Sequence, residues 1–215
     1  MEFSPGNPIV GLFLVDQEVK ATKQPDLKSR FFDTGYAVLR SGFDTEEETY
    51  FLFNATSIQD LGHQHKDRGS FSLYAFNTPL AVDPGVTGYS EAHLWHRRSR
   101  AHNQVIFEDA ETKGPGKFSS HFFDEQIDYV EADLNKAVGE KYYRRIFFVK
   151  PDFYMIWDDI DSKKSAQYQL HVLTQENLPL VYKGQNDSIL FGCQNKVDFE
   201  VKVLCPQIST NNKLF

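Results

Sequence analysis

Hydrophobic and polar residues alternate with a period of two in several stretches of the chain. In the clearest one, Val197, Phe199 and Val201 alternate with Asp198 and Glu200. This pattern is typical of a strand with one face in a protein core and the other in water. Similar short aromatic and β-branched runs recur between Gly, Pro, Asn and Asp residues. We predict strands over 35–41, 48–54, 70–76, 79–83, 103–108, 118–124, 126–133, 142–149, 153–158, 166–174, 179–183, 188–192 and 197–204.

The order of these segments predicts an all-β fold. More than ten short strands with turns about every eight to twelve residues are typical of a large antiparallel β-sandwich of two sheets. The strand over 142–149 has apolar residues on both faces, so we expect both to be covered. No stretch gives a convincing amphipathic helix, and the nearest, 133–140, is short. We expect residues 1–30 to be a lead-in with at most a short strand near 12–15, and 31–215 to be a single domain.

Length and charge narrow the classes of partner. A chain of 215 residues can bury the core of one large β-domain. A net charge of −7 argues against a nucleic-acid-binding protein. It also requires that any acidic glycan be bound by a local cluster of positive charge. No apolar run approaches the ~18 residues of a membrane span, and the first residues lack the features of a secretory signal.

The two cysteines are predicted to be free thiols. If 188–194 and 197–204 form a hairpin that turns at Asn195, Cys193 lies opposite Asp198 and Cys205 lies further along the ladder. Their Cα atoms would then be further apart than the ~5.5–6 Å that a disulfide requires.

Candidate chemistry is concentrated between residues 61 and 103. His63 and His65 form a His-x-His pair, and in an extended strand side chains two apart point to the same face. Asp83 follows an apolar run and precedes Pro-Gly, so a carboxylate lies where a buried strand turns. Imidazole nitrogens and a carboxylate oxygen together suit zinc. His65, Asp83 and His102 are one such candidate set, with His63 left free.

A basic segment precedes His102. It contains Trp95, Arg97, Arg98 and Arg100. Arginine matches carboxylate and sulfate geometry, and a tryptophan face can stack on a sugar ring, so this segment is a candidate contact for an acidic glycan. A solvated basic loop explains the same residues equally well.

Other polar residues near these positions have structural explanations as well. Asp67 could orient a histidine by accepting a hydrogen bond from its ring, or stabilise a turn. Tyr89 is interpreted as a hydrogen-bonded residue in the surroundings of the site. His171 faces away from the apolar positions of its strand, which favours the surface over an approach to the site, and His121 is expected to be packed.

The residues between 31 and 175 also resemble a known family. The chain is similar to the C-terminal β-domain of the heparinase II/III-like family of polysaccharide lyases. The motifs that support this are Gly-His-x-His-x-Asp-x-Gly-Ser-Phe from residue 62, Pro-Leu-Ala-x-Asp-Pro-Gly from residue 79, His102-Asn103-x-Val105, the segment 35–42, the segment 144–151 and Trp157-Asp158-Asp159.

The resemblance implies a function and a set of roles. It implies cleavage of a uronic-acid polysaccharide, of the glycosaminoglycan or alginate type, by β-elimination. His65, Asp83 and His102 would hold zinc beside the catalytic His63. Family members carry an N-terminal helical domain that this chain does not contain, so we expect a fragment with little activity alone. A periplasmic or secreted location is implied, and a homodimer is left open.

Two rival interpretations fit the same sequence. The metal site of a cupin-like enzyme also begins with His-x-His, but the cupin pattern requires a Glu about four residues later. This chain has Ser70 there and no Glu between Gly62 and Tyr89. A non-catalytic carbohydrate-binding domain, in which the histidines are structural, is the other. Iron with oxidase activity would favour the first, and glycan binding without metal would favour the second.

Overall fold

The computed structural model describes residues 28–42, 46–58, 64–86, 88, 91–174, 181–183 and 188–204. Every strand pairing among them is antiparallel. The largest sheet has five strands in the order β1-β2-β3-β4-β5, so each strand pairs with its neighbour in the chain. Its strands are β1 (Arg30–Phe32), β2 (Tyr36–Arg40), β3 (Thr49–Asn54), β4 (Phe71–Ala75) and β5 (Thr78–Ala81).

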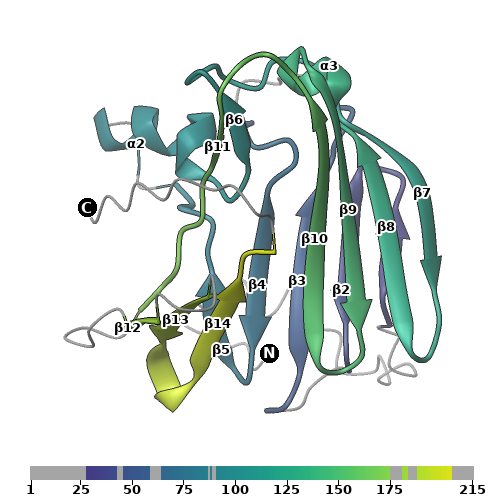
Figure 1. Ribbon diagram of the computed structural model, residues 1–215, viewed down its shortest axis with the longest axis vertical. Helices are drawn as coiled ribbons and strands as arrows, with labels where there is room; N and C mark the ends of the chain where they lie inside the picture. The colour runs from purple at the N-terminus through teal and green to yellow at the C-terminus, as the bar shows by residue number, and fades with distance from the viewer. Residues whose placement is uncertain are drawn as a thin grey trace, which may run out of the picture.

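A second sheet of four strands has the order β10-β9-β8-β7, again a meander. Its strands are β7 (Lys117–Phe123), β8 (Ile127–Asp133), β9 (Lys141–Val149) and β10 (Phe153–Asp161). The two sheets form the two layers of a sandwich (Figure 1). Their facing side chains make one core, in which the ring of Phe51 stacks on Tyr154 at 5.0 Å and Phe53 meets Phe118 edge-on at 5.4 Å.

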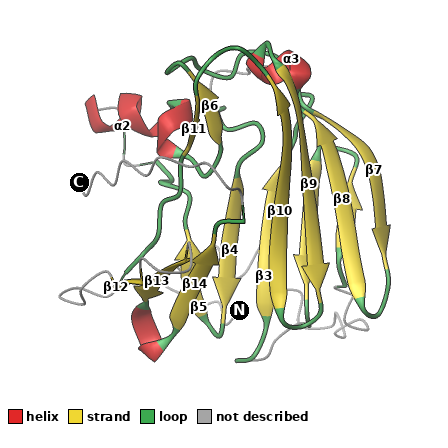
Figure 2. Cartoon of the chain, in the orientation of Figure 1, coloured by secondary structure: helices red, strands yellow, loops and turns green. Residues whose placement is uncertain are grey.

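Smaller elements lie beside the β4 and β5 edge of the sandwich (Figure 2). One pair consists of β6 (Val105–Phe107) and β11 (Ala166–Tyr168). A three-stranded sheet contains β12 (Val181–Lys183), β13 (Ser188–Gly192) and β14 (Asp198–Lys202). The helical pieces on this side are α2 (Glu91–His96) and the 3₁₀ turns η1 (Ser99–Ala101) and η2 (Gln194–Lys196). Helix α3 (Asn135–Val138) instead connects β8 to β9 at the end of the four-stranded sheet (Figure 2). No helix in the described part of the chain is long and apolar enough to cross a membrane.

The all-β antiparallel sandwich predicted from the alternation is confirmed. In β14, Phe199 and Val201 are half-buried, and the residues that alternate with them, Asp198, Glu200 and Lys202, are exposed. In β9, alternate residues from Tyr142 to Phe148 are buried, but the opposite face is partly exposed rather than fully covered. The outer face of the four-stranded sheet is therefore a molecular surface in this chain.

Three details differ from the sequence-based expectations. Helix α2 and strand β1 were not predicted. The hairpin of β13 and β14 pairs Gly192 with Asp198, so Cys193 lies opposite Val197, one position from the prediction. Cys193 is a buried free thiol, as expected. Cys205 and the segment 12–15 lie outside the described residues.

Candidate functional site

His65 lies in the loop that connects β3 to β4, not in a strand. The spacing of His63 and His65 therefore does not place His65 by strand geometry, which corrects the sequence argument. Hydrogen bonds to the main chain hold the loop instead. Lys66 N donates to Arg97 O at 2.9 Å. Lys66 O accepts from Ser99 Oγ and from Gln104 Nε2, each at 2.7 Å. The loop is thus fixed to the segment that leads to His102.

The other end of this loop is fixed from the opposite sheet. Gly69 has a φ of +91°, and a Cβ there would lie 2.7 Å from Cδ1 of Leu134, so only glycine fits without strain. Gly69 N donates to Asn54 O at 2.7 Å. Gly69 O accepts from Nη1 of Arg144 at 2.6 Å. The Arg144 side chain is fully buried and forms a two-point ion pair with Asp158, with contacts of 2.7 and 2.9 Å.

Asp83 and His102 are in direct contact. Asp83 follows the end of β5, and its Oδ1 accepts from the Gly85 amide at 2.9 Å. Its Oδ2 lies 2.8 Å from Nδ1 of His102, whose ring is completely buried. The side chain of Asn103 donates to Phe71 O at 2.8 Å and to Val82 O at 3.0 Å. This amide therefore joins β4, the end of β5 and the His102 segment at one point.

The structure brings His65, Asp83 and His102 together. One ligand atom from each lies within 4.8 Å of the other two. The rings of His65 and His102 have centroids 5.2 Å apart. Within the described residues, Nε2 of His102 is buried and has no hydrogen-bond partner. An unpaired buried polar atom is costly, and a metal ion is one way to satisfy it. Two imidazoles and one carboxylate are a donor set that fits zinc.

The pKa shifts favour the protonation states that metal ligands need. Burial lowers the pKa of His65, and the neighbouring His102 lowers it further, so the neutral ring is favoured. Burial acts to raise the pKa of Asp83, but hydrogen bonds from His102 and the Gly85 amide outweigh it and lower the pKa overall. A neutral imidazole and an ionised carboxylate are the binding-competent forms.

The three arginines of the basic segment lie in different surroundings. Arg97 turns toward the loop of His65, where its Nη2 donates to Gln64 O at 3.4 Å. Arg100 pairs with Asp109 at 2.9 Å, and both side chains are well exposed. Arg98 is exposed and forms no ion pair among the described residues. Arg97 is therefore the arginine most closely tied to the cluster.

The remaining predicted residues are only partly placed. Burial raises the pKa of Asp67, and the charge of His102 acts against this rise, so the two groups are near one another. The carboxylate bonded to a histidine ring among the described residues is that of Asp83, not Asp67. His63 and Tyr89 lie outside the described residues.

Sequence reasoning gave too little weight to two residues that the structure connects to this region. His171 was expected at the surface, but it is half-buried, and its backbone N–H donates to Asn103 Oδ1 at 2.6 Å. Its ring also lies 6.2 Å from that of Trp95, which is 43% exposed on α2. Arg144 was noted only as part of a motif.

His121 was expected to be packed, but it is exposed and stacks on Phe31 at 4.8 Å.

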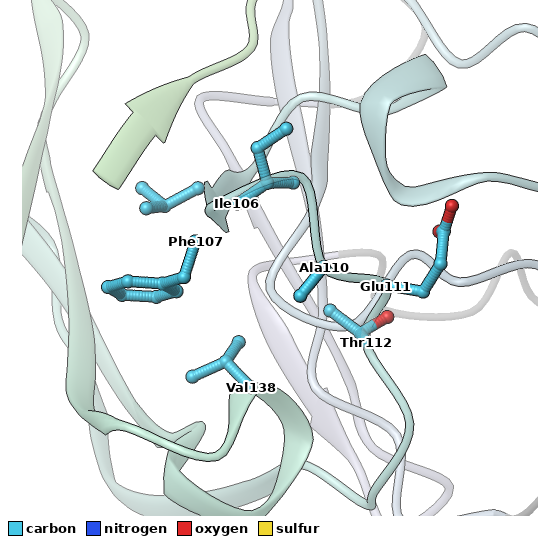
Figure 3. Close-up of a pocket in the computed structure, with 7 residues that line it drawn as sticks. Ile106, Phe107, Ala110, Glu111, Thr112 and Val138 are labelled. Carbon is cyan, nitrogen blue, oxygen red and sulfur yellow. The ribbon is translucent and has the colours of Figure 1, made fainter. Parts of the chain in front are cut away.

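A separate apolar recess lies between β6 and α3 (Figure 3). Its lining is Val105, Ile106, Phe107, Ala110, Glu111, Thr112 and Val138. The two polar side chains are already bonded: Glu111 accepts from Ser99 N at 2.6 Å, and Thr112 Oγ1 accepts from Ser99 Oγ at 3.4 Å. The space between the side chains does not admit a water molecule, so the recess is a packing feature rather than a binding site.

Comparison with known proteins agrees with this fold. The family described as "Heparinase II/III-like, C-terminal" matches residues 23–202. A mutant of heparan sulfate lyase HepC from Pedobacter heparinus superposes with a TM-score of 0.76 at 18% identity, over 88% of this chain and 31% of that chain. A heparinase III superposes with a TM-score of 0.70 at 21% identity, over 82% of this chain and 29% of that one.

These relatives are much longer than this chain. It spans about 30% of the length of the heparinase III whose lysines are methylated, which superposes over 86% of this chain with a TM-score of 0.71 at 20% identity. No curated protein matches the sequence. Because the family match extends over most of the chain, the chain belongs to the heparinase II/III-like family and corresponds to its C-terminal domain.

Proposed function

We propose that this chain is the C-terminal β-domain of a lyase that cleaves a uronic-acid polysaccharide, of the glycosaminoglycan or alginate type, by β-elimination. Membership of the heparinase II/III-like family supports the reaction class. The observation that supports a role for this domain in the site is the close grouping of His65, Asp83 and His102, with ligand atoms within 4.8 Å of one another.

His65, Asp83 and His102 are the residues that would hold a zinc ion. The ion would fix the shape of the site beside His63 rather than polarise the substrate. The donor types, the favoured protonation states and the unpaired Nε2 of His102 support this assignment. The hydrogen bonds that hold the loop of His65 and the segment of His102 keep the donors in place before any ion arrives.

The proposed reaction needs three groups. A positive charge must neutralise the uronate carboxylate, a base must remove the proton from the adjacent carbon, and an acid must protonate the glycosidic oxygen as the C–O bond breaks and the C=C bond forms. His63 is the proton-transfer residue in this proposal, because imidazole can accept or donate a proton near neutral pH. Arg97, with Arg98 and Arg100, binds the carboxylate, and Trp95 contacts the sugar.

The chain would supply one wall of the cleft, and the helical domain of the same protein the other. The share of the longer relatives that this chain spans, 31% or less for the structures compared, supports an incomplete site. We expect little turnover from the chain alone. An ultraviolet assay for unsaturated uronate tests this, and rapid product formation by the isolated chain would contradict it.

Metal analysis of purified protein tests the proposed ligand set. The wild-type chain should contain about one zinc ion, and His65→Ala should lose most of it, because two protein ligands hold zinc poorly. His121→Ala is the matched control, since His121 is an exposed histidine on β7 that stacks on Phe31. Metal content unchanged by His65→Ala would remove the ligand set. Iron with oxidase activity would favour the cupin interpretation, and glycan binding without metal a binding module.

A further inference from the structure

His171 is held in place by three hydrogen bonds to residues around the candidate site. Its backbone N–H donates to Asn103 Oδ1 at 2.6 Å, and its carbonyl accepts from Val82 N at 2.9 Å. The third joins its ring Nε2 to Arg100 O at 3.0 Å. Val82 and Asn103 are the chain neighbours of two of the candidate ligands, so His171 lies beside the cluster. Its ring position is fixed by the main chain rather than by surface packing.

The bond to Arg100 determines which ring nitrogen carries the proton. A carbonyl oxygen can only accept, so Nε2 of His171 must be the donor, and in the neutral ring Nδ1 is then an acceptor. Burial lowers the pKa of His171, which favours that neutral ring. Among the described residues Nδ1 has no hydrogen-bond partner, and it is not one of the buried unpaired atoms. It is therefore an open acceptor within reach of solvent.

Trp95 lies next to the ring of His171. Its ring and that of His171 are nearly perpendicular, with centroids 6.2 Å apart and an interplanar angle of 86°. The tryptophan is 43% exposed, so part of its surface is available to a ligand. An aromatic surface next to a single oriented acceptor is a common composition for a small-molecule site. A sugar ring, which has an apolar C–H face and hydroxyl groups at its edge, matches both groups.

We propose that Trp95 and His171 form a subsite for one sugar ring of the substrate, in which Nδ1 of His171 accepts a hydrogen bond from a sugar hydroxyl. The ring packs on Trp95. This inference rests on the proposed function, because the ligand is a residue of the uronic-acid polysaccharide. It adds a residue that accepts from a hydroxyl, whereas the arginines can only donate.

Two substitutions of His171 separate this role from a structural one. In His171→Asn the amide oxygen can occupy the position of Nδ1, but the donor to Arg100 O is lost. In His171→Gln the amide nitrogen can occupy the position of Nε2 and keep the bond to Arg100 O, but no acceptor then occupies the position of Nδ1. The subsite predicts that Gln weakens sugar binding and Asn largely preserves it. A purely structural role predicts the reverse.

The experiment is a titration of the 215-residue chain with heparan sulfate hexasaccharides and, separately, alginate hexamers. Trp157, the second tryptophan of the chain, is replaced by Phe so that Trp95 alone reports through its fluorescence. We expect saturable quenching for one sugar class, five- to tenfold weaker binding for His171→Gln, and binding within about twofold of the reference for His171→Asn. His121→Gln is the control and should bind normally, and zinc content should be equal in all variants.

Each other outcome has a defined meaning. Normal binding by His171→Gln, whether or not His171→Asn is weakened, overturns the subsite and leaves the proposed function intact. If both variants bind the sugar more weakly at equal zinc content, the Nδ1 contact is also overturned, because the amide oxygen of His171→Asn should preserve sugar binding. If the reference chain binds neither sugar class, the subsite is overturned together with the substrate class of the proposed function.

Discussion

The buried Arg144 offers the sharpest test of how the site is supported. Its guanidinium pairs with both oxygens of Asp158 and donates to the carbonyl of Gly69 at 2.6 Å. The Tyr142 hydroxyl donates to the same carboxylate at 2.9 Å. One side chain thus joins two strands of the four-stranded sheet to the loop that presents His65. Replacing it by Met keeps an unbranched apolar side chain and removes the bonds that the guanidinium makes to Asp158 and Gly69.

The expected loss of stability is large because the partner stays buried. Asp158 has a side chain only 7% exposed, and after Arg144→Met it would keep only the Tyr142 hydroxyl as a partner. Breaking a buried pair from one side costs about 3–5 kcal/mol. For a chain of this size that lowers the melting temperature by roughly 6–20 °C. The double variant Arg144→Met/Asp158→Leu should recover most of the loss, since no uncompensated charge remains.

The assay is urea unfolding with a chelator and again with excess zinc. Zinc should raise the free energy of unfolding of the wild-type chain, because an ion that binds only the folded state stabilises it. If Arg144 positions the loop, the rise should be smaller in Arg144→Met, by about 1.4 kcal/mol for each tenfold loss of zinc affinity. Arg145→Met is the control, because Arg145 pairs with Glu131 on the outer face, where an ion pair contributes ~0–1 kcal/mol.

Two results would refute this reasoning. A loss below about 1 kcal/mol for Arg144→Met in chelator would show that the burial of the ion pair has been given too much weight. If Arg144→Met is much less stable than wild type in both conditions, but zinc raises its free energy of unfolding by as much as in wild type, Arg144 supports the fold but not the loop. The control variant should leave both quantities within about 1 kcal/mol of wild type.

Two further predictions concern single positions. Gly69→Ala should destabilise the chain by about 1–3 kcal/mol in urea, because its φ is +91° and a Cβ would lie 2.7 Å from Leu134 Cδ1; wild-type stability would contradict it. The hydrogen bond from Ser119 lowers the pKa of Glu131, and so does the pairing with Arg145. Burial acts in the opposite direction but is outweighed. The wild-type chain should therefore have a higher free energy of unfolding than Glu131→Gln above about pH 4.5, and this difference should disappear as the pH falls through the lowered pKa. A difference that persists in acid would contradict this prediction.

The strands were predictable because they depend on local alternation. The segment 142–149 became β9, Lys141–Val149, and 197–204 became β14, Asp198–Lys202. Each has one face that must be buried, and a period of two admits only a strand. The six-residue helix α2 was not predictable in this way, because so short a segment covers fewer than two turns and shows no repeated helical period.

The candidate ligands were found through their chemistry, and the reason given for their geometry was partly wrong. His65 lies in a loop, so the rule that side chains two apart share a face does not apply to it. Asp83 does follow the end of a buried strand, as its position before Pro-Gly indicated. The residues that fix the ligands were missed for a physical reason. The bond from His171 to Arg100 O joins residues 71 positions apart, and no local pattern reports such a contact.

The polar side chains around the cluster both satisfy buried backbone groups and fix the positions of the candidate ligands. A loop that passes beneath the surface leaves backbone groups that must find partners, or the fold loses free energy for each one. Asn103 provides partners for the carbonyls of Phe71 and Val82, and Gln104 does so for Lys66 and Ser99. Because these carbonyls belong to the segments that present the candidate ligands, satisfying them also fixes where the ligands lie. The position of the cluster is thus determined by buried side-chain amides, which is why strand patterning alone locates the layers of the sandwich but not its site.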